Sequence, residues 1–112
     1  MVKSVSVDVA RTFTQRTVGL IGRTHVGEGE GMLFEHCSSI HTLFMRVPID
    51  VIFLDEGRRV VRSVPSVQPW CPFVGCAAAQ RVVELAAGEI ERRGIAVGDL
   101  LDLEPAKMSQ HL

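Results

Sequence analysis

Two carboxylates stand inside apolar segments of this 112-residue chain and are its first candidates for chemistry. Asp50 interrupts the apolar run Ile49–Leu54, and Glu84 interrupts the run Arg81–Ala86. A buried carboxylate is unfavourable unless it is paired, hydrogen-bonded or neutralised by a raised pKa. The sequence therefore allows two interpretations. Each acid is held in a structural ion pair, or the two acids act together as the general acid and base of a hydrolase-type enzyme.

The ion pair is the preferred interpretation because arginines occur near both acids along the chain. Arg46, Arg62 and Arg81 are the nearest candidate partners. If Asp50 is buried and paired in this way, its removal leaves an uncompensated charge and destabilises the fold.

Histidines and cysteines form a set that superficially resembles a metal site: His36, Cys37, His41, Cys71 and Cys76. The last two are five residues apart and lack the C-x₂-C spacing of structural zinc sites, so we expect neither a metal nor a cofactor. A nucleophile pair of Cys37 and His41 lacks a visible orienting group and oxyanion hole. Three cysteines are an odd number, which argues against a disulfide framework and favours a reducing compartment.

The densest apolar stretch of the chain runs from Gly31 to Asp55 and should position these groups. Its β-branched and aromatic residues predict strands at Met32–Phe34, Ile40–Val47 and Ile49–Leu54. Pro48 cannot donate to a strand ladder and marks the corner between the two longer runs. Both faces of Ile49–Leu54 are mostly apolar, which is typical of a strand that is covered on two sides.

Alternation along the predicted strand Ile40–Val47 places Thr42, Phe44 and Arg46 on one face and His41 on the other. If the sheet encloses an accessible interior, one of these sets lines a small-molecule pocket. The alternative for His41 is a hydrogen-bonded core histidine without a catalytic role.

Turn signals and alternating apolar residues predict the remaining elements. They are a strand at Val2–Val9, a helix through Gln15–Ile21, a glycine-rich loop at Gly27–Gly31, a turn at Asp55–Gly57, a strand at Arg59–Val67, a loop at Gln68–Gly75, a strand within Ala77–Ala87, a helix at Gly88–Gly94 and a strand at Leu100–Leu103.

Trp70 and Phe73 lie in the long, proline-rich loop Gln68–Gly75. Aromatic residues in such a loop either plug the core or form a lid over a ligand site, and we favour the plug. If the loop is a lid, these two aromatics together with His41 and Arg46 are the candidates for contact with a partner.

Five separated blocks of this sequence resemble the bacterial and archaeal family called domain of unknown function 192. The resemblance extends from about Ala10 to Leu103 and implies a compact, mostly antiparallel, barrel-like domain with a few short helices. It implies no reaction, because the family has none established. Many members have tryptophan where this chain has Phe44. The blocks are Gly31–Phe34, His41–Asp55, Pro69–Trp70, Val83–Gly88 and Gly98–Asp99.

Composition, pattern and resemblance together predict a mainly β (α+β) fold: a small, mostly antiparallel, β-barrel-like single domain over residues 1–105 with a frayed tail at 106–112. The net charge of −1 offers no basic footprint for nucleic acid. No signal-like or membrane-spanning run begins the chain, so we expect a cytoplasmic protein without a membrane partner.

The leading functional hypothesis is a small binding or accessory domain that recognises a small molecule or a peptide at the barrel mouth. A hydrolase-type enzyme using Asp50 and Glu84 is one alternative, and a structural or protein-interaction domain is another. The candidate ligand-binding residues are His41, Thr42, Arg46, Asp50, Trp70 and Glu84.

Overall fold

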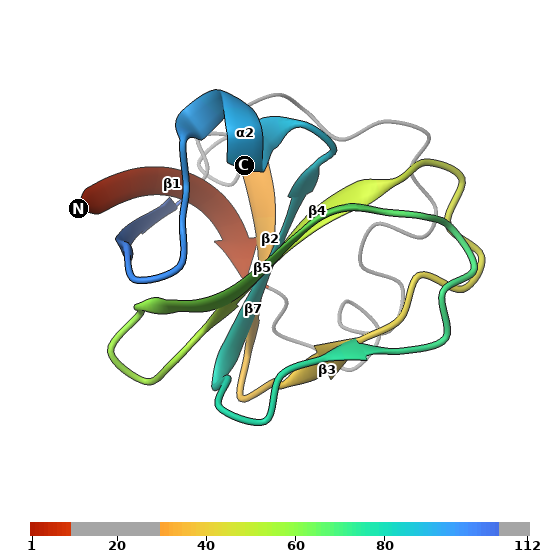
Figure 1. Ribbon diagram of the computed structural model, residues 1–112, viewed down its shortest axis with the longest axis horizontal. Coiled ribbons are helices and arrows are strands. Elements are labelled where there is room, and N and C mark those ends of the chain that lie inside the picture. The colour runs from red at the N-terminus through yellow and green to blue at the C-terminus, as the bar shows by residue number, and fades with distance from the viewer. Residues whose placement is uncertain (10–29, 106–112) are drawn as a thin grey trace, which may run out of the picture.

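The structure, a computed structural model, describes residues 1–9 and 30–105. These residues form a six-stranded sheet that lies beside a two-stranded sheet (Figure 1). The strand order of the large sheet is β5-β4-β7-β2-β1-β8, and β3 pairs with β6 in the small sheet. The elements are β1 (Val2–Val9), β2 (Glu30–Glu35), β3 (Ser39–Ile40), β4 (Ile49–Leu54), β5 (Val60–Val67), β6 (Val74–Gly75), β7 (Arg81–Ala86), α2 (Glu89–Arg93) and β8 (Leu100–Pro105).

β4 is the centre of the fold, because it lies between β5 and β7 and all six of its residues are buried. Val51 and Phe53 face a first core that also holds Val67 and Val74. Their neighbours on the opposite face of β4 enter a second core beneath α2 and β8. The prediction of a strand covered on both sides is confirmed.

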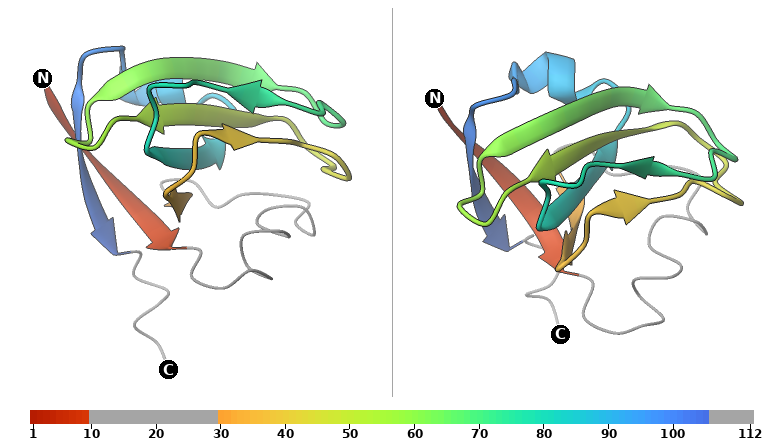
Figure 2. Two further views of the ribbon diagram at one scale, coloured as in Figure 1. Left: turned by 90° about the horizontal axis from the view of Figure 1, so that it is seen from below. Right: turned by 60° about the horizontal axis from the view of Figure 1, so that its bottom comes forward.

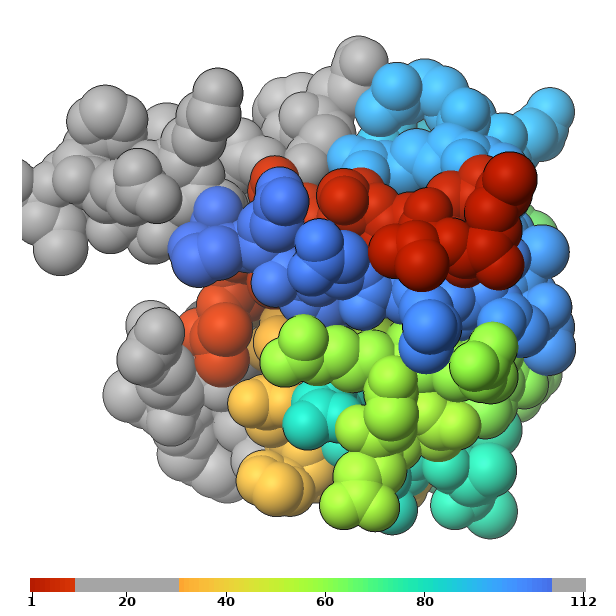
Figure 3. Space-filling view, turned by 90° about the vertical axis from the view of Figure 1, so that its left-hand side faces the viewer, coloured from red at the N-terminus to blue at the C-terminus, as the bar shows by residue number. Residues whose placement is uncertain are grey.

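The mainly β prediction is confirmed, but the sheet is not closed into a barrel. β1 pairs in parallel with β2 and β8, whereas the other strand pairs are antiparallel. Within residues 1–9 and 30–105, the outer strands β5 and β8 meet at one end, through an isolated bridge between Arg59 and Leu100 and a hydrogen bond from Val60 N to Asp99 O of 2.8 Å. On the face in Figure 3, β8 lies between β1 and the β4–β5 hairpin.

The predicted strand Ile40–Val47 is wrong, since only Ser39–Ile40 is extended and paired. The chain then turns: Met45 N donates to Thr42 O at 3.1 Å, and Phe44 has a positive φ of 68°. A left-handed residue interrupts the regular geometry of a strand. The expected alternation of faces therefore fails here.

The other predicted elements within the described residues are confirmed to within a few residues at their ends. Asp55–Gly57 forms the hairpin turn, and Gly94 ends α2 in the left-handed conformation with φ 66°. The predicted helix Gln15–Ile21, most of the glycine-rich loop and the tail 106–112 lie outside the described residues. Within residues 1–9 and 30–105, no helix is long and apolar enough to cross a membrane.

Figure 2 shows the small sheet of β3 and β6 lying beside the β4–β5 hairpin. Two hydrogen bonds of the residues that flank β3 and β6 hold this sheet in place: Cys37 N donates to Gln80 O at 3.0 Å, and Cys76 N donates to Ser38 O at 2.9 Å. Ile40 of β3 and Val74 of β6 pack in the first core with Val51 and Phe53, so the small sheet covers that face of β4.

Candidate functional site

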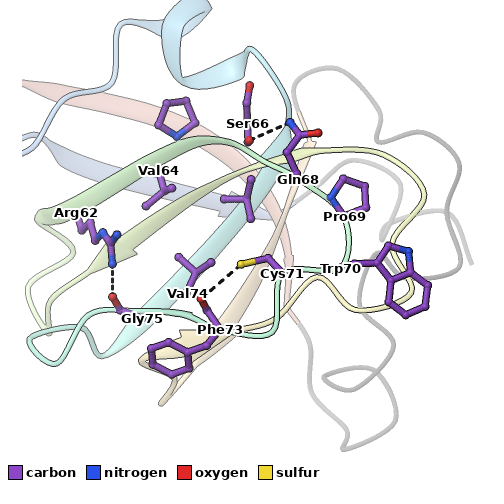
Figure 4. A pocket seen from close by; sticks show the side chains of 12 residues that line it. Arg62, Val64, Ser66, Gln68, Pro69, Trp70, Cys71, Phe73, Val74 and Gly75 are labelled. Atoms are coloured by element: carbon purple, nitrogen blue, oxygen red, sulfur yellow. Dashed lines mark hydrogen bonds between the residues drawn. The ribbon is translucent and has the colours of Figure 1, made fainter.

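A pocket of about 530 Å³ opens between β5 and β6 (Figure 4). Val67 and Val74 are buried and form its apolar floor, whereas Trp70 and Phe73 stand exposed at its rim. The volume lies in the usual range for small-ligand pockets. The described residues that line it are Arg62, Val64, Pro65, Ser66, Val67, Gln68, Pro69, Trp70, Cys71, Phe73, Val74 and Gly75.

Trp70 forms an exposed aromatic pair with Phe44 from the loop before β4. Their ring centroids are 4.8 Å apart and the ring planes are tilted by 59°. The two side chains are 59% and 60% exposed, so the expectation that Trp70 plugs the core is wrong. Their backbones adopt φ of 67° and 68°, which is unusual for bulky residues and costs about 1–3 kcal/mol each.

Thr42 fastens the two loops that carry this pair. Its buried hydroxyl donates to Gln68 O at 2.7 Å and accepts from Cys71 N at 2.8 Å. Its backbone N donates to Cys71 O, and its carbonyl accepts from Trp70 N, both at 2.8 Å. Thr42 thus supports the rim from beneath and does not contact the pocket itself.

Replacing Thr42 with Val should lower the free energy of unfolding by about 1–3 kcal/mol, because the Cys71 amide and Gln68 carbonyl lose a buried partner at almost constant volume. Chemical denaturation measures the loss. Thr42→Ser keeps the hydroxyl and should retain more of the stability. Equal stability of Thr42→Val and the wild type would show that the hydroxyl does not fasten the loops.

Among the described residues of the pocket lining, Arg62 is the charged one and none is acidic. Its Nη1 donates to Gly75 O across the gap between β5 and β6 (Figure 4), and its guanidinium lies 5.9 Å from the centroid of the Phe53 ring. The end of the pocket opposite Trp70 therefore carries a positive charge.

Asp50 is fully buried and binds three backbone amides instead of an arginine. Oδ1 accepts from Ser66 N at 2.9 Å, and Oδ2 accepts from Gly88 N at 3.1 Å and Ile90 N at 2.8 Å. Ser66 lies in a bulge of β5 with φ 51°, and Ile90 lies in the first turn of α2. One carboxylate thus joins an irregular strand to a helix start.

Glu84 is buried without a hydrogen bond or ion pair from any residue of the described ranges. It is 6% exposed, and its register partners, Met32 and Val51, belong to the first core. Burial raises the pKa of Glu84 from 4.5 to about 8. The side chain is therefore largely protonated at neutral pH.

Asp50 and Glu84 lie on opposite faces of the large sheet. Asp50 is paired across β4 and β7 with Leu85, a residue of the second core, whereas Glu84 is paired with Val51 of the first. Directly paired residues share a face, and adjacent positions do not. The two acids therefore do not share a cavity, and this placement gives no support to an acid and base pair.

The arginines near these acids in sequence have other positions. Arg81 Nε binds Glu35 at 2.6 Å, and Arg46 is exposed. A buried acid that does bind arginine is Glu89 of α2: the hydrogen bond from Arg92 and, next, that from Arg93 lower its pKa to about 2 despite burial.

His41 is exposed rather than in the core, and its Nδ1 accepts a hydrogen bond from Leu43 N at 3.2 Å. Within the described part of the chain, no three His, Cys, Asp or Glu residues are grouped as metal ligands. Of the residues predicted to bind a ligand, only Trp70 lines the pocket, and Thr42 supports it. The sequence did not predict that Arg62 lines the pocket, because this position depends on the packing of β6 opposite β5.

The fold and the pocket together define a small β-sheet domain with an open, aromatic-rimmed groove. A family model described as uncharacterised ACR, domain of unknown function 192, matches residues 1–103. The chain belongs to this family.

Archaeal relatives are similar over much of the chain. The UPF0127 protein of Thermococcus sibiricus is 33% identical over 88% of this chain and 66% of its own length. The UPF0127 protein of Pyrococcus furiosus is 42% identical over 58% of this chain and 55% of its own length. The UPF0127 protein of Pyrococcus abyssi is 32% identical over 86% of this chain and 84% of its own length. The chain thus spans less than two thirds of the length of the first two relatives.

Two solved structures share the fold. A protein of unknown function from Novosphingobium aromaticivorans is 28% identical, with a TM-score of 0.74 over 82% of this chain and 70% of that one. A proposed transcription regulator from Sinorhizobium meliloti is 23% identical, with a TM-score of 0.75 over 82% of this chain and 76% of that one. The second likeness concerns the fold alone.

Proposed function

We propose that the protein is a small binding domain that recognises a small molecule or a peptide in the groove between β5 and β6. The observation that carries this proposal is the Phe44–Trp70 pair, which is exposed although both backbones are strained. Strained residues persist where the surrounding structure enforces them, and such positions cluster at ligand sites. Thr42 supplies the enforcement through its hydrogen bonds to both loops.

Rigid aromatic side chains bind partners with little loss of conformational entropy, and they are enriched among the residues that dominate binding energy. The groove adds an apolar floor and few polar groups, which is the usual composition of a ligand pocket. Catalysis is less well supported, since the two candidate acids lie on opposite faces of the sheet. The three free cysteines are consistent with a reducing compartment, and we propose a cytoplasmic location.

Trp70 is the single tryptophan of the chain, so its fluorescence reports on the groove alone. In the free protein we expect emission typical of a solvent-exposed indole. A screen of small molecules and short peptides that carry an apolar group should yield compounds that shift this emission and raise the thermal midpoint together.

Trp70→Ala should abolish the thermal stabilisation by these compounds while changing the stability of the free protein by less than about 1 kcal/mol, because little buried area is lost. Val97 is similarly exposed, at 62%, and lies outside the pocket lining. Val97→Ala is therefore the matched control and should bind normally. Blue-shifted emission that no compound changes, with strong destabilisation by Trp70→Ala, would contradict the proposal.

A further inference from the structure

We infer that the groove receives the carboxyl-terminal end of an extended peptide, with the terminal carboxylate on Arg62 and an apolar last side chain over Val64 and Val74. This inference rests on the proposed function and specifies its ligand. Three features carry it: two lining strands that each have an unpaired side, the limited length of the open edge, and the charge of the lining.

The groove separates two strands that each have an unpaired side. β5 is an outer strand of the large sheet, and β3 is the one partner of β6 among the described strands. Within the described ranges, no backbone hydrogen bond joins β5 to β6, and the Arg62 side chain spans the gap to Gly75 O. Unpaired strand edges offer backbone donors and acceptors that an extended peptide can satisfy.

The open part of the β5 edge is short. Val60 N is bonded to Asp99 O, Pro65 has no N–H to donate, and Ser66 N is bonded to Asp50. The free stretch is therefore Val61–Val64, which is about 13 Å at about 3.3 Å per residue. Such a length suits the last few residues of a chain better than a long added strand.

The charge of the lining selects an anionic end. Arg62 has five N–H donors, of which the bond to Gly75 O uses one, and none of the described lining residues is acidic. A guanidinium binds a carboxylate through two parallel hydrogen bonds. Figure 4 shows Arg62 at one end of the groove, Trp70 at the other, and the side chains of Val64 and Val74 between them.

The test is a titration with N-acetylated tetrapeptides that end in Val, Leu, Ile or Phe, each made with a free carboxylate and as the amide. Trp70 fluorescence measures the affinity. We expect the best acid to bind at least about tenfold more tightly than its amide, since charge-assisted hydrogen bonds are lost with the carboxylate.

Arg62→Gln should weaken the binding of the peptide acid by about the same factor and leave the binding of the peptide amide unchanged. The two proteins and the two peptides together form a double-mutant cycle. Arg62→Lys should restore part of the affinity, because it keeps the charge without the planar fork. Arg58→Gln is the matched control: it removes one exposed positive charge at the β4–β5 turn, outside the pocket. Thermal midpoints check that each variant is folded.

Equal binding of acid and amide, or unchanged acid binding by Arg62→Gln, overturns the inference while the proposed function stands. The same holds if no peptide binds but other compounds show binding that depends on Trp70. If neither peptides nor other compounds bind at Trp70, the proposed function fails as well.

Discussion

Asp50→Ala should lower the free energy of unfolding by about 3–5 kcal/mol, a large fraction of the stability of a domain of this size. The substitution removes the shared acceptor of three amides, so the buried hydrogen bond of Ile90 N and the part-buried ones of Ser66 N and Gly88 N are all lost. Each unsatisfied buried donor costs about 1–3 kcal/mol. Urea denaturation followed by circular dichroism measures the loss.

Asp50→Asn is the informative companion variant, because it keeps one acceptor oxygen but turns a donor group towards the amides. We expect it to be intermediate in stability. Asp55→Ala is the control. The half-buried carboxylate of Asp55 accepts a hydrogen bond from Arg59 N at 2.9 Å in an exposed hairpin turn, so its removal should lower the free energy of unfolding less than Asp50→Ala does. A wild-type midpoint for Asp50→Ala would mean that its carboxylate does not hold β5 and α2 together.

Glu84→Gln should make the protein less sensitive to alkaline pH. The pKa of Glu84 is about 8 in the folded state and near 4.5 when the chain is unfolded. A raised folded-state pKa contributes stability that is complete below about pH 4.5 and is lost as the pH rises to about 8. At about 1.4 kcal/mol per pH unit, the loss amounts to about 5 kcal/mol.

The glutamine variant removes this titration but keeps the shape of the protonated acid. The unfolding free energy of the glutamine variant should be closest to that of the wild type near pH 5. At pH 9 it should be larger than that of the wild type by several kcal/mol. Denaturation curves of both proteins between pH 5 and 9 give the difference directly, because other titrating groups are common to the two. A difference that stays constant with pH would show that Glu84 ionises freely in the folded protein.

Local patterns in the sequence were sufficient to predict most of the strands. Ile49–Leu54 and the Asp55–Gly57 turn are specified by neighbouring residues, and Gly94 ends its helix because glycine tolerates a left-handed backbone. The segment after Ile40 was mispredicted because contacts with a distant loop decide its conformation. Thr42 binds Gln68 and Cys71, 26 and 29 residues away, and no local pattern reveals that pairing.

The candidate site depends on the same long-range geometry. Alternation along one strand says which residues share a face, but the relation between Asp50 and Glu84 needs the register of β4 on β7. The sequence correctly indicated that both acids are buried. It indicated arginine partners for them, whereas backbone amides bind Asp50 and protonation accommodates Glu84. Arg62 reaches the groove only because β6 packs opposite β5.

The central claim is that the groove between β5 and β6 binds a ligand, and amide chemical shifts test it most directly. The ¹⁵N-labelled protein would be titrated with N-acetylvaline and N-acetylphenylalanine, which combine an apolar group, an amide and a carboxylate. We predict that saturable shifts concentrate at Arg62, Val64, Trp70 and Gly75 and disappear in Trp70→Ala. Shifts centred on β1 and β8, with none in the groove, would contradict the account.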